Sequence, residues 1–162
     1  MAIHFNCGDK EEAIDIMREA AEWLNNIGQP MWELNDLTSE KLDNPAENFI
    51  ILWNDLKSVA AMILNFEDNF FWPSITPGTS GFIHKLSVRR EYASKGYAKM
   101  MVEHAKTICK SKNIPHLRLD CDANRNGLMQ FYLTCGFKLF ETKSIHTKKL
   151  GKLDFALFEM NI

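Results

Sequence analysis

The sequence predicts an α/β fold built on a mixed β-sheet. Segments whose apolar residues recur at helical spacing alternate along the chain with short runs of apolar and β-branched residues. The chain has 162 residues, and at about 150 residues per domain this length allows a single hydrophobic core, so we expect a single domain over residues 1–162. Hydrophobic residues make up 46% of the chain and charged residues 25%, as in folded globular proteins.

The first helix is predicted from a run of apolar residues at helical spacing. It follows a strand candidate at residues 2–6, with Asp9 placed as its N-cap and Gly28 as its stop. Thr38 then predicts a short second helix that ends before Pro45. The apolar residues of the first helix are Ala13, Ile16, Met17, Ala20, Leu24 and Ile27.

The middle of the chain predicts strands. Two apolar runs at 49–53 and 58–66 are separated by the polar segment 54–57 and predict a β-hairpin. Residues 67–81 contain many breakers together with aromatic side chains and predict a loop. Another strand is expected at 82–88.

The C-terminal half continues the alternation of helices and strands. The strongest helical periodicity covers 95–110, a strand candidate follows at 117–121, and Gly136 ends a further helix where a positive φ is expected. Strands at 137–142 and 153–160, joined by a basic loop, complete the pattern. The expected fold is a mixed sheet flanked by helices.

The charge balance excludes some classes of partner. Lys and Arg number 19 and Asp and Glu 21, so the net charge of −2 argues against duplex DNA or an anionic membrane bound through overall basicity. The longest apolar runs are much shorter than the ~18 residues of a membrane-spanning helix. The first residues lack the basic flank and apolar run of a signal peptide, so we expect a cytoplasmic protein.

The four cysteines, including Cys7, show no Cys-x-x-Cys spacing, and we expect them to be reduced and mostly buried. A zinc site is the alternative, but the spacings match no known zinc module and we expect no metal. Its ligands would be Cys109, Cys121 and Cys135 with His104 or His116.

The segment 84–98 predicts an anion-binding site. A strand turns through Gly96 directly into the strongest helix, and the amides of a first helical turn have no partner within the helix. Between residues 85 and 99 five basic residues and one acidic residue give a net charge of +4. The alternative is that Gly96 only permits tight packing and the lysines are solvated. The charged residues are Lys85, Arg89, Arg90, Lys95, Lys99 and Glu91.

Two phosphate-binding motifs are absent from the sequence. No Gly-x-x-x-x-Gly-Lys-Ser/Thr motif is present, which disfavours a nucleoside triphosphatase of that type, and no Gly-x-Gly-x-x-Gly motif indicates a dinucleotide site.

The turn from Ala93 to Ala98 resembles the Gln/Arg-x-x-Gly-x-Gly/Ala signature of the GNAT N-acetyltransferase superfamily, with Ala93 in place of the first residue. The resemblance implies a mixed, mostly antiparallel sheet of six to seven strands flanked by four helices. It also implies that the turn binds the diphosphate of acetyl-CoA through backbone amides, and that Leu86 and Val88 contact the pantetheine arm. The turn residues are Ala93, Ser94, Lys95, Gly96, Tyr97 and Ala98.

A second block, residues 120–137, resembles the family's fifth strand and fourth helix, which often end in Tyr-x-x-x-Gly-Phe. Tyr132 and Gly136 fit this ending. The family commonly has Asn seven residues before the Tyr, where this chain has Arg125 between two asparagines. Asn124 or Asn126 is therefore the expected cofactor contact.

The resemblance implies transfer of an acetyl group from acetyl-CoA to a primary amine of a small molecule or peptide, by direct attack in a ternary complex. Tyr132 is the candidate general acid for the leaving thiolate, although a tyrosine on the apolar face of a helix is usually a core residue. His84 is the candidate base because histidine titrates near neutral pH. The alternatives are Glu67, Asp120, Asp122 or a water relay.

The acceptor site is implied to lie between residues 29–36 and the basic loop 144–152. Trp32, Glu33 and Asp120 are the candidate acceptor contacts. The basic loop either favours an anionic acceptor or is solvated; its charged or titratable side chains include His146, Lys148, Lys149 and Lys152.

Three questions remain open at the level of sequence. The aromatic run 70–72 is a substrate wall, a dimer contact or a loop folded back over the core. A homodimer is compatible with the sequence. The alternative function is a non-catalytic module that binds or senses acyl-CoA.

Overall fold

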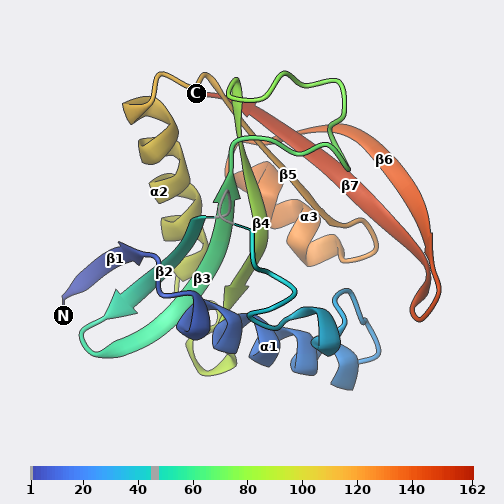
Figure 1. Ribbon diagram of the computed structural model, residues 1–162, viewed down its shortest axis with the longest axis horizontal. Coiled ribbons are helices and arrows are strands. Elements are labelled where there is room, and N and C mark those ends of the chain that lie inside the picture. Colours follow the sequence, from blue (N-terminus) through green and yellow to red (C-terminus); the bar gives the residue numbers. More distant parts are fainter. Residues whose placement is uncertain (1, 45–47) are drawn as a thin grey trace. The chain divides into compact units, whose positions relative to one another are not determined.

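The computed structural model describes residues 2–44 and 48–162 and divides the chain into two compact units. Unit 1 comprises Met1–Leu64 and His84–Glu103, and unit 2 comprises Asn65–Ile83 and His104–Ile162. The described residues form seven strands in the order β1-β2-β3-β4-β5-β7-β6 (Figure 1). The sheet is mixed and mostly antiparallel, as the resemblance implied, and this prediction is confirmed. That one domain covers the whole chain stays a prediction.

Unit 1 contains a helix, three strands and the ends of two elements shared with unit 2. In chain order the elements are β1 (Ile3–Cys7), α1 (Lys10–Asn26), the 3₁₀ turn η1 (Leu34–Asp36), β2 (Asn48–Asn54), β3 (Lys57–Asn65), the second part of β4 (Ser80–Val88), the 3₁₀ turn η2 (Arg90–Tyr92) and the first part of α2 (Tyr97–Ser111).

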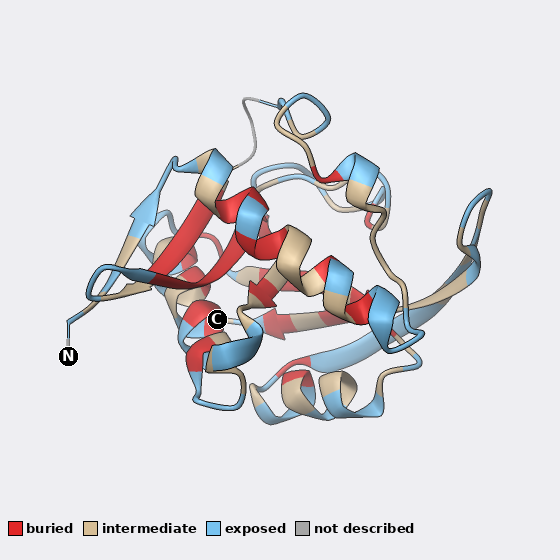
Figure 2. Ribbon diagram, turned by 90° about the horizontal axis from the view of Figure 1, so that it is seen from below, coloured by how far each residue is buried: buried red, intermediate tan, exposed pale blue. Residues whose placement is uncertain are grey.

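The helix α1 forms where the periodicity predicts it. The Asp9 carboxylate accepts a hydrogen bond from the Glu12 amide at 3.3 Å, an N-cap that stabilises a helix by about 1 kcal/mol. Gly28 follows the helix with φ 76°, the conformation that glycine supplies most readily. Figure 2 shows the buried face of α1, whose Ile16 and Met17 pack in one core cluster with Ile51 of β2 and Ile63 of β3.

The predicted hairpin is also confirmed. β2 and β3 pair in antiparallel register from Asn48–Leu64 to Asn54–Lys57. The turn begins at Asp55 with φ 55°, and β1 pairs antiparallel with the other edge of β2.

The prediction of four helices is wrong, because the described residues contain three α-helices. In place of the second helix the chain has η1 and a single turn in which the Leu42 amide donates to the Thr38 carbonyl oxygen at 3.0 Å. The expected cap does form, since Thr38 Oγ1 accepts from the Lys41 amide at 3.2 Å. One turn is too short to offset the cost of helix nucleation. The predicted stop, Pro45, lies outside the described residues.

Unit 2 contains the remaining strands and one whole helix. β4 pairs in parallel with β5 from Ser80–His116 to Ile83–Leu119. β7 pairs antiparallel with both β5 and β6. The elements are the first part of β4, the last part of α2, β5 (His116–Asp122), α3 (Asn126–Thr134), β6 (Lys138–Thr147) and β7 (Gly151–Asn161).

The basic loop predicted at 144–152 is mostly strand. β6 continues to Thr147 and β7 begins at Gly151, so only residues 148–150 form the turn. Thr147 Oγ1 fixes this turn by donating to the Gly151 carbonyl oxygen and accepting from the Leu150 amide, both at 2.9 Å. β6 is an edge strand with mostly exposed side chains, and a strand that is polar on both faces lacks the apolar alternation that identifies strands in a sequence.

The aromatic run 70–72 covers the core of unit 2. Trp72 is 3% exposed and packs with Phe82 and Leu157. The Phe71 ring lies 4.9 Å from that of Phe155, whereas Phe70 is 68% exposed. The loop-cover interpretation therefore holds for Phe71 and Trp72. Among the described helices, none combines the length and apolar character that crossing a bilayer requires.

Candidate functional site

The turn between β4 and α2 is built from backbone hydrogen bonds within unit 1. The Arg89 amide donates to the Val59 carbonyl oxygen of β3 at 2.9 Å. The amides of Tyr92 and Ala93 donate to the carbonyl oxygens of Arg89 and Arg90, which closes η2. The Ala93 amide is therefore already used, and it does not join the free donors that the sequence predicted at 93–98.

The donors that are available lie at the start of α2. Over residues 2–44 and 48–162, no protein atom accepts a hydrogen bond from the amides of Gly96, Tyr97 or Ala98, and the helical pattern begins with the Met100 amide on the Gly96 carbonyl oxygen at 3.1 Å. Ser94 and Gly96 have φ values of 63° and 88°, so the chain reverses sharply before the helix. Amides in a first helical turn point along the axis toward an anion.

Gly96 is not needed for close packing. A Cβ added to it would have no atom within 4 Å, so the interpretation that this glycine only permits tight contact of helix and strand is wrong. Its positive φ is the feature that requires glycine, and the open space beside it leaves room for a ligand.

The basic residues around the turn do not converge on it. Arg89 points to α1, and the Arg90 guanidinium lies 3.8 Å from the centre of the Trp23 ring. Lys85 Nζ lies 5.4 Å from the Trp32 ring centre. Among the basic residues that gave the segment its charge of +4, Lys95 and Lys99 lie nearest in sequence to the free amides, and both are exposed. The backbone therefore supplies more of this site than the charge count predicted.

The other expected cofactor contacts of unit 1 lie on β4 and on the first turn of α2. Leu86 and Val88 are half-buried residues of β4, which contains an irregularity at Lys85, where φ is 53°. The Tyr97 side chain is 7% exposed and accepts a hydrogen bond from Asn54 Nδ2 at 3.0 Å. Tyr97 is thus available to a ligand through its amide, while its ring and hydroxyl anchor the helix.

The candidate base and acceptor residues of unit 1 are partly exposed. His84 follows Ile83, the last residue of β4 in register with β5. Trp32 packs against the core cluster of α1 and β2, and Glu33 precedes η1 as its N-cap residue. The cation–π contact with Lys85 places a positive charge beside Trp32.

Tyr132 lies in an aromatic environment in unit 2. It is 5% exposed, with the rings of Phe131, Phe137 and Phe158 at 5.1, 5.8 and 6.0 Å. Burial raises the pKa of Tyr132 far above its ordinary value, and Cys121 and Asp120 add to the rise. The phenol therefore keeps its proton at any physiological pH, as a hydrogen-bond donor must.

The two candidate asparagines differ in their contacts. The Asn124 side chain donates to Asp154 at 3.5 Å, and its amide donates to Asp122 Oδ1 at 2.9 Å. Asn126 is the first residue of α3. Asn124 thus maintains the turn between β5 and α3, which leaves Asn126 as the better candidate for a ligand contact.

The alternative bases also separate by environment. Asp122 is 9% exposed and is used by the Asn124 amide, so it is poorly placed to accept a substrate proton. Asp120 is partly exposed on β5, opposite Leu157 of β7, and Glu67 is exposed.

The cysteines are free thiols, as expected. Cys109 and Cys121 are buried and Cys135 is half-buried, in agreement with the expectation that most would be hidden, and Cys7 is the exposed exception. In the part of the chain that is described, the cysteines of unit 2 do not gather with His104 or His116 at ligand distances.

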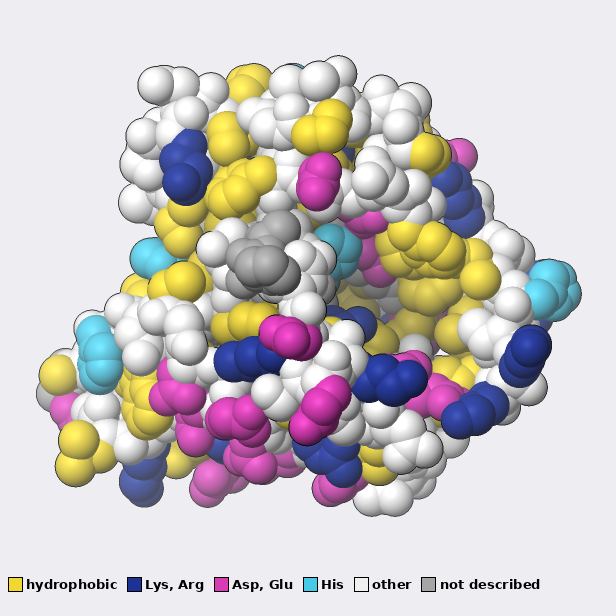
Figure 3. Space-filling model, in the orientation of Figure 1, with side chains coloured by type: hydrophobic (Ala, Val, Ile, Leu, Met, Phe, Trp, Pro, Cys, Tyr) yellow, Lys and Arg dark blue, Asp and Glu magenta, His cyan; other side chains and the backbone are white. Residues whose placement is uncertain are grey.

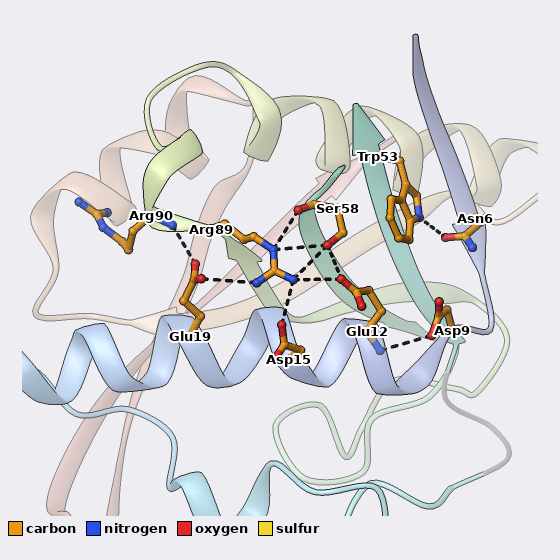
Figure 4. A network of polar contacts seen from close by, with 9 residues as sticks. All are labelled: Asn6, Asp9, Glu12, Asp15, Glu19, Trp53, Ser58, Arg89 and Arg90. Atoms are coloured by element: carbon orange, nitrogen blue, oxygen red, sulfur yellow. Dashed lines mark hydrogen bonds and ion pairs between the residues drawn. The ribbon is translucent and has the colours of Figure 1, made fainter. Parts of the chain in front are cut away.

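One group of residues escaped sequence reasoning. Glu12, Asp15 and Glu19 of α1 and Ser58 of β3 surround the Arg89 guanidinium (Figure 4). The spacing i, i+3, i+7 places the three acids on one helix face and was the available signal. Figure 3 shows acidic side chains gathered over α1 in the lower part of the view.

Comparisons with known proteins extend the resemblance. The model of the acetyltransferase (GNAT) family matches residues 14–137. An uncharacterized N-acetyltransferase, YesJ of Bacillus subtilis strain 168, is 22% identical over 142 residues, which cover 80% of this chain and 77% of that protein.

Solved structures show the same fold. The ribosomal-protein-S18-alanine N-acetyltransferase from Escherichia coli aligns with a TM-score of 0.70 at 13% identity, over 99% of this chain and 94% of that chain. The PaiA N-acetyltransferase from Thermoplasma acidophilum, in complex with coenzyme A, aligns with a TM-score of 0.70 at 19% identity over 100% of both chains.

Proposed function

Because the chain belongs to the GNAT acetyltransferase family, whose acetyl donor is acetyl-CoA, we propose that it is an N-acetyltransferase acting on a primary amine of a small molecule or peptide. The observation that carries the proposal is the set of unengaged amides at Gly96, Tyr97 and Ala98, at the position of the family's diphosphate-binding turn. These donors suit the diphosphate of coenzyme A.

The cofactor would be bound mainly by backbone. Ser94, Lys95 and Gly96 shape the turn, and the amides from Gly96 to Ala98 would donate to the diphosphate. Leu86 and Val88 of β4 would pair with the pantetheine arm, and Asn126 would contribute a side-chain contact. The exposed Lys95 and Lys99 add positive charge near the turn.

The reaction is acyl transfer. Acetyl-CoA supplies a thioester whose carbonyl carbon forms a bond to the neutral amine nitrogen as the carbon–sulfur bond breaks. The nitrogen loses a proton to a base, and the departing thiolate ends as the thiol of coenzyme A.

Tyr132 would stabilise the thiolate as it leaves. Its raised pKa makes complete transfer of its proton to the thiolate unfavourable, because the thiol that would form has a pKa of only about 8.5. We therefore assign it the donation of a hydrogen bond to the sulfur while the thiolate forms, with the sulfur's final proton coming from solvent.

The proton of the amine would pass to His84 or to water. A lysine-like amine is largely protonated at neutral pH, and freeing it costs roughly 4–5 kcal/mol, so a base on the path raises the rate. Trp32, Glu33 and Asp120 are the proposed acceptor contacts. The Escherichia coli neighbour, by its name, modifies an alanine of a ribosomal protein, which is consistent with a peptide acceptor here.

A cytoplasmic location is part of the proposal. All four cysteines are free thiols, and a reducing compartment maintains that state.

The decisive experiment measures coenzyme A binding by calorimetry and thiol release from acetyl-CoA with a panel of small amines and peptides. Binding together with release that depends on an acceptor supports the enzyme. Binding without release from any acceptor supports the acyl-CoA sensor, and no binding rejects both.

A further inference from the structure

The Arg89 guanidinium joins the segment between β4 and η2 to β3 and α1 within unit 1. Its Nε donates to the Ser58 carbonyl oxygen of β3 at 2.9 Å. Its Nη2 donates to Glu12 Oε1 and Asp15 Oδ2, both at 3.0 Å, and its Nη1 donates to Glu19 Oε1 at 3.4 Å. Figure 4 shows the guanidinium between Ser58 and the carboxylates of α1. All three nitrogens are therefore used, in the planar fork that only arginine provides.

The surroundings of Arg89 make these contacts durable. The Arg89 side chain is 14% exposed, and Ser58 is 6% exposed and donates in turn to Glu12 Oε1. Partial burial would lower the pKa of the Arg89 guanidinium, but the hydrogen bond to Asp15 and the charges of Asp15, Glu19 and Glu12 raise it overall. Without this cation the three carboxylates would repel one another beside a buried hydroxyl.

The cluster continues into the backbone of the diphosphate-binding turn. Glu19 uses its second oxygen, Oε2, to accept a hydrogen bond from the Arg90 amide at 3.0 Å. Arg90 is the first residue of η2, and its carbonyl oxygen accepts from Ala93, immediately before the reversal at Ser94. Glu19 thus connects the Arg89 guanidinium with the first amide of η2, the segment that leads into the turn.

We propose that Arg89, acting through Glu19, is a positioning residue that fixes the direction in which the turn presents its amides. Arg89 directs its side chain away from the turn and into α1, so it supplies no charge to the ligand. Its role is to orient donors that bind by geometry, because a hydrogen bond weakens steeply when its angle departs from linearity. The inference rests on the proposed function, since the bound group is the diphosphate of coenzyme A.

Asp15 provides a matched control. Glu19 and Asp15 lie on the same helix and each accepts from Arg89, but among the described contacts only Glu19 also bonds the turn. A purely structural cluster would respond alike to the loss of either acid. A positioning cluster would respond at the turn only when Glu19 is removed.

The test compares Glu19→Ala, Asp15→Ala and Arg89→Met in the full chain by thermal unfolding, calorimetric titration with coenzyme A, and kcat and KM for acetyl-CoA. We expect Glu19→Ala and Arg89→Met to raise the Kd and KM by roughly fivefold to tenfold with kcat within about twofold, and Asp15→Ala to change the Kd by less than about twofold. Equal Kd values for the two α1 variants would overturn the proposal. If Arg89→Met does not fold, the comparison of Glu19→Ala with Asp15→Ala is sufficient to test the proposal.

Hydrogen exchange separates this inference from the proposed function. Peptides covering Tyr92 and Ala93 of the ligand-free protein should exchange faster in Glu19→Ala than in Asp15→Ala, whether or not coenzyme A binds. If the wild-type protein binds no coenzyme A, the proposed function falls, while faster exchange still supports the control of the turn by Glu19. Unchanged exchange in Glu19→Ala rejects that control.

Discussion

The two units carry candidate groups of different chemical kinds. In unit 1 the turn before α2 offers backbone amides, and its shape depends on hydrogen bonds and ion pairs. In unit 2 Tyr132 offers one hydroxyl, and its surroundings are aromatic rings. A backbone site tolerates changes of side chain but not of conformation, whereas a side-chain site fails with the loss of one atom. The following experiments test this difference.

The largest effect is expected for Tyr132→Phe. The substitution removes only the hydroxyl, so kcat should fall roughly 100-fold or more, as when a hydrogen-bond donor to a developing anion is lost, while the Kd for coenzyme A changes by less than about twofold. Steady-state kinetics and calorimetry measure the two quantities. Tyr92→Phe removes a hydroxyl from unit 1 and serves as the control. An unchanged kcat in Tyr132→Phe would remove the residue from the mechanism.

Gly96→Ala tests the backbone site through its conformation. The φ of 88° is unfavourable for alanine although its Cβ would have open space, so the turn should change shape and the Kd for coenzyme A should rise about tenfold. The effect on stability should be about 1–2 kcal/mol.

Gly127→Ala in α3 is the matched glycine control. Its Cβ would also meet no atom within 4 Å, and its φ is not in the positive range. It should leave the Kd unchanged and stabilise the protein by up to about 1 kcal/mol. Equal Kd values in the two glycine variants would contradict the assignment of the turn.

The environment of Tyr132 has a consequence at alkaline pH. The pKa of Tyr132 is raised, so the folded state keeps this proton above pH ~10, where a tyrosine in the unfolded chain ionises. The unfolded state then binds fewer protons than the folded state, and Tyr132 lowers the stability progressively as the pH rises above that value. Native wild type and Tyr132→Phe should show equal tyrosinate absorbance at about pH 11 and differ after unfolding. A difference in the native state would contradict the burial of the phenol.

The smallest effect concerns the thiols and leaves activity untouched. Burial raises the pKa of Cys109 to about 11 and that of Cys121 to about 12, so few thiolates form at these positions near neutral pH. Cys7 is exposed and should be alkylated first, at a rate roughly 100-fold or more above that of either buried thiol. Mass spectrometry of timed iodoacetamide reactions gives the order, and early labelling of Cys121 would contradict it.

The sequence predicted most of the elements because their patterns are local. Asp9 and Gly28 mark the ends of α1, and Gly136 ends α3 with φ 102°, as its position predicted. The resemblance predicted the turn at 93–98. The sequence patterns failed in the second half of β6, where residues 144–147 were expected in a basic loop, and around Thr38, where a short segment could not propagate as a helix.

The partners of each charge were beyond sequence reasoning. By sequence, Arg89 belongs to a positive segment near the predicted anion site. In the structure Arg89 instead donates hydrogen bonds to carboxylates of α1 that are 70–77 residues distant along the chain. The burial of Tyr132 was foreseen from its apolar helix face, whereas the effect of its neighbours on the phenol depends on β5 and β7. Such contacts are set by the packing of remote segments, and no local pattern records them.

The path of the chain through the two units has a consequence for synthesis. The chain leaves unit 1 after β3, returns within β4 and leaves again within α2. Neither unit is contiguous. A cut between the second and third crossings would sever a regular element or the peptide that carries the turn before α2. Residue 103 must leave the ribosome before unit 1 can complete its fold. The first segment of unit 2, residues 65–83, has been synthesised by then. We therefore expect the two units to fold together and not to fold when they are expressed as separate fragments.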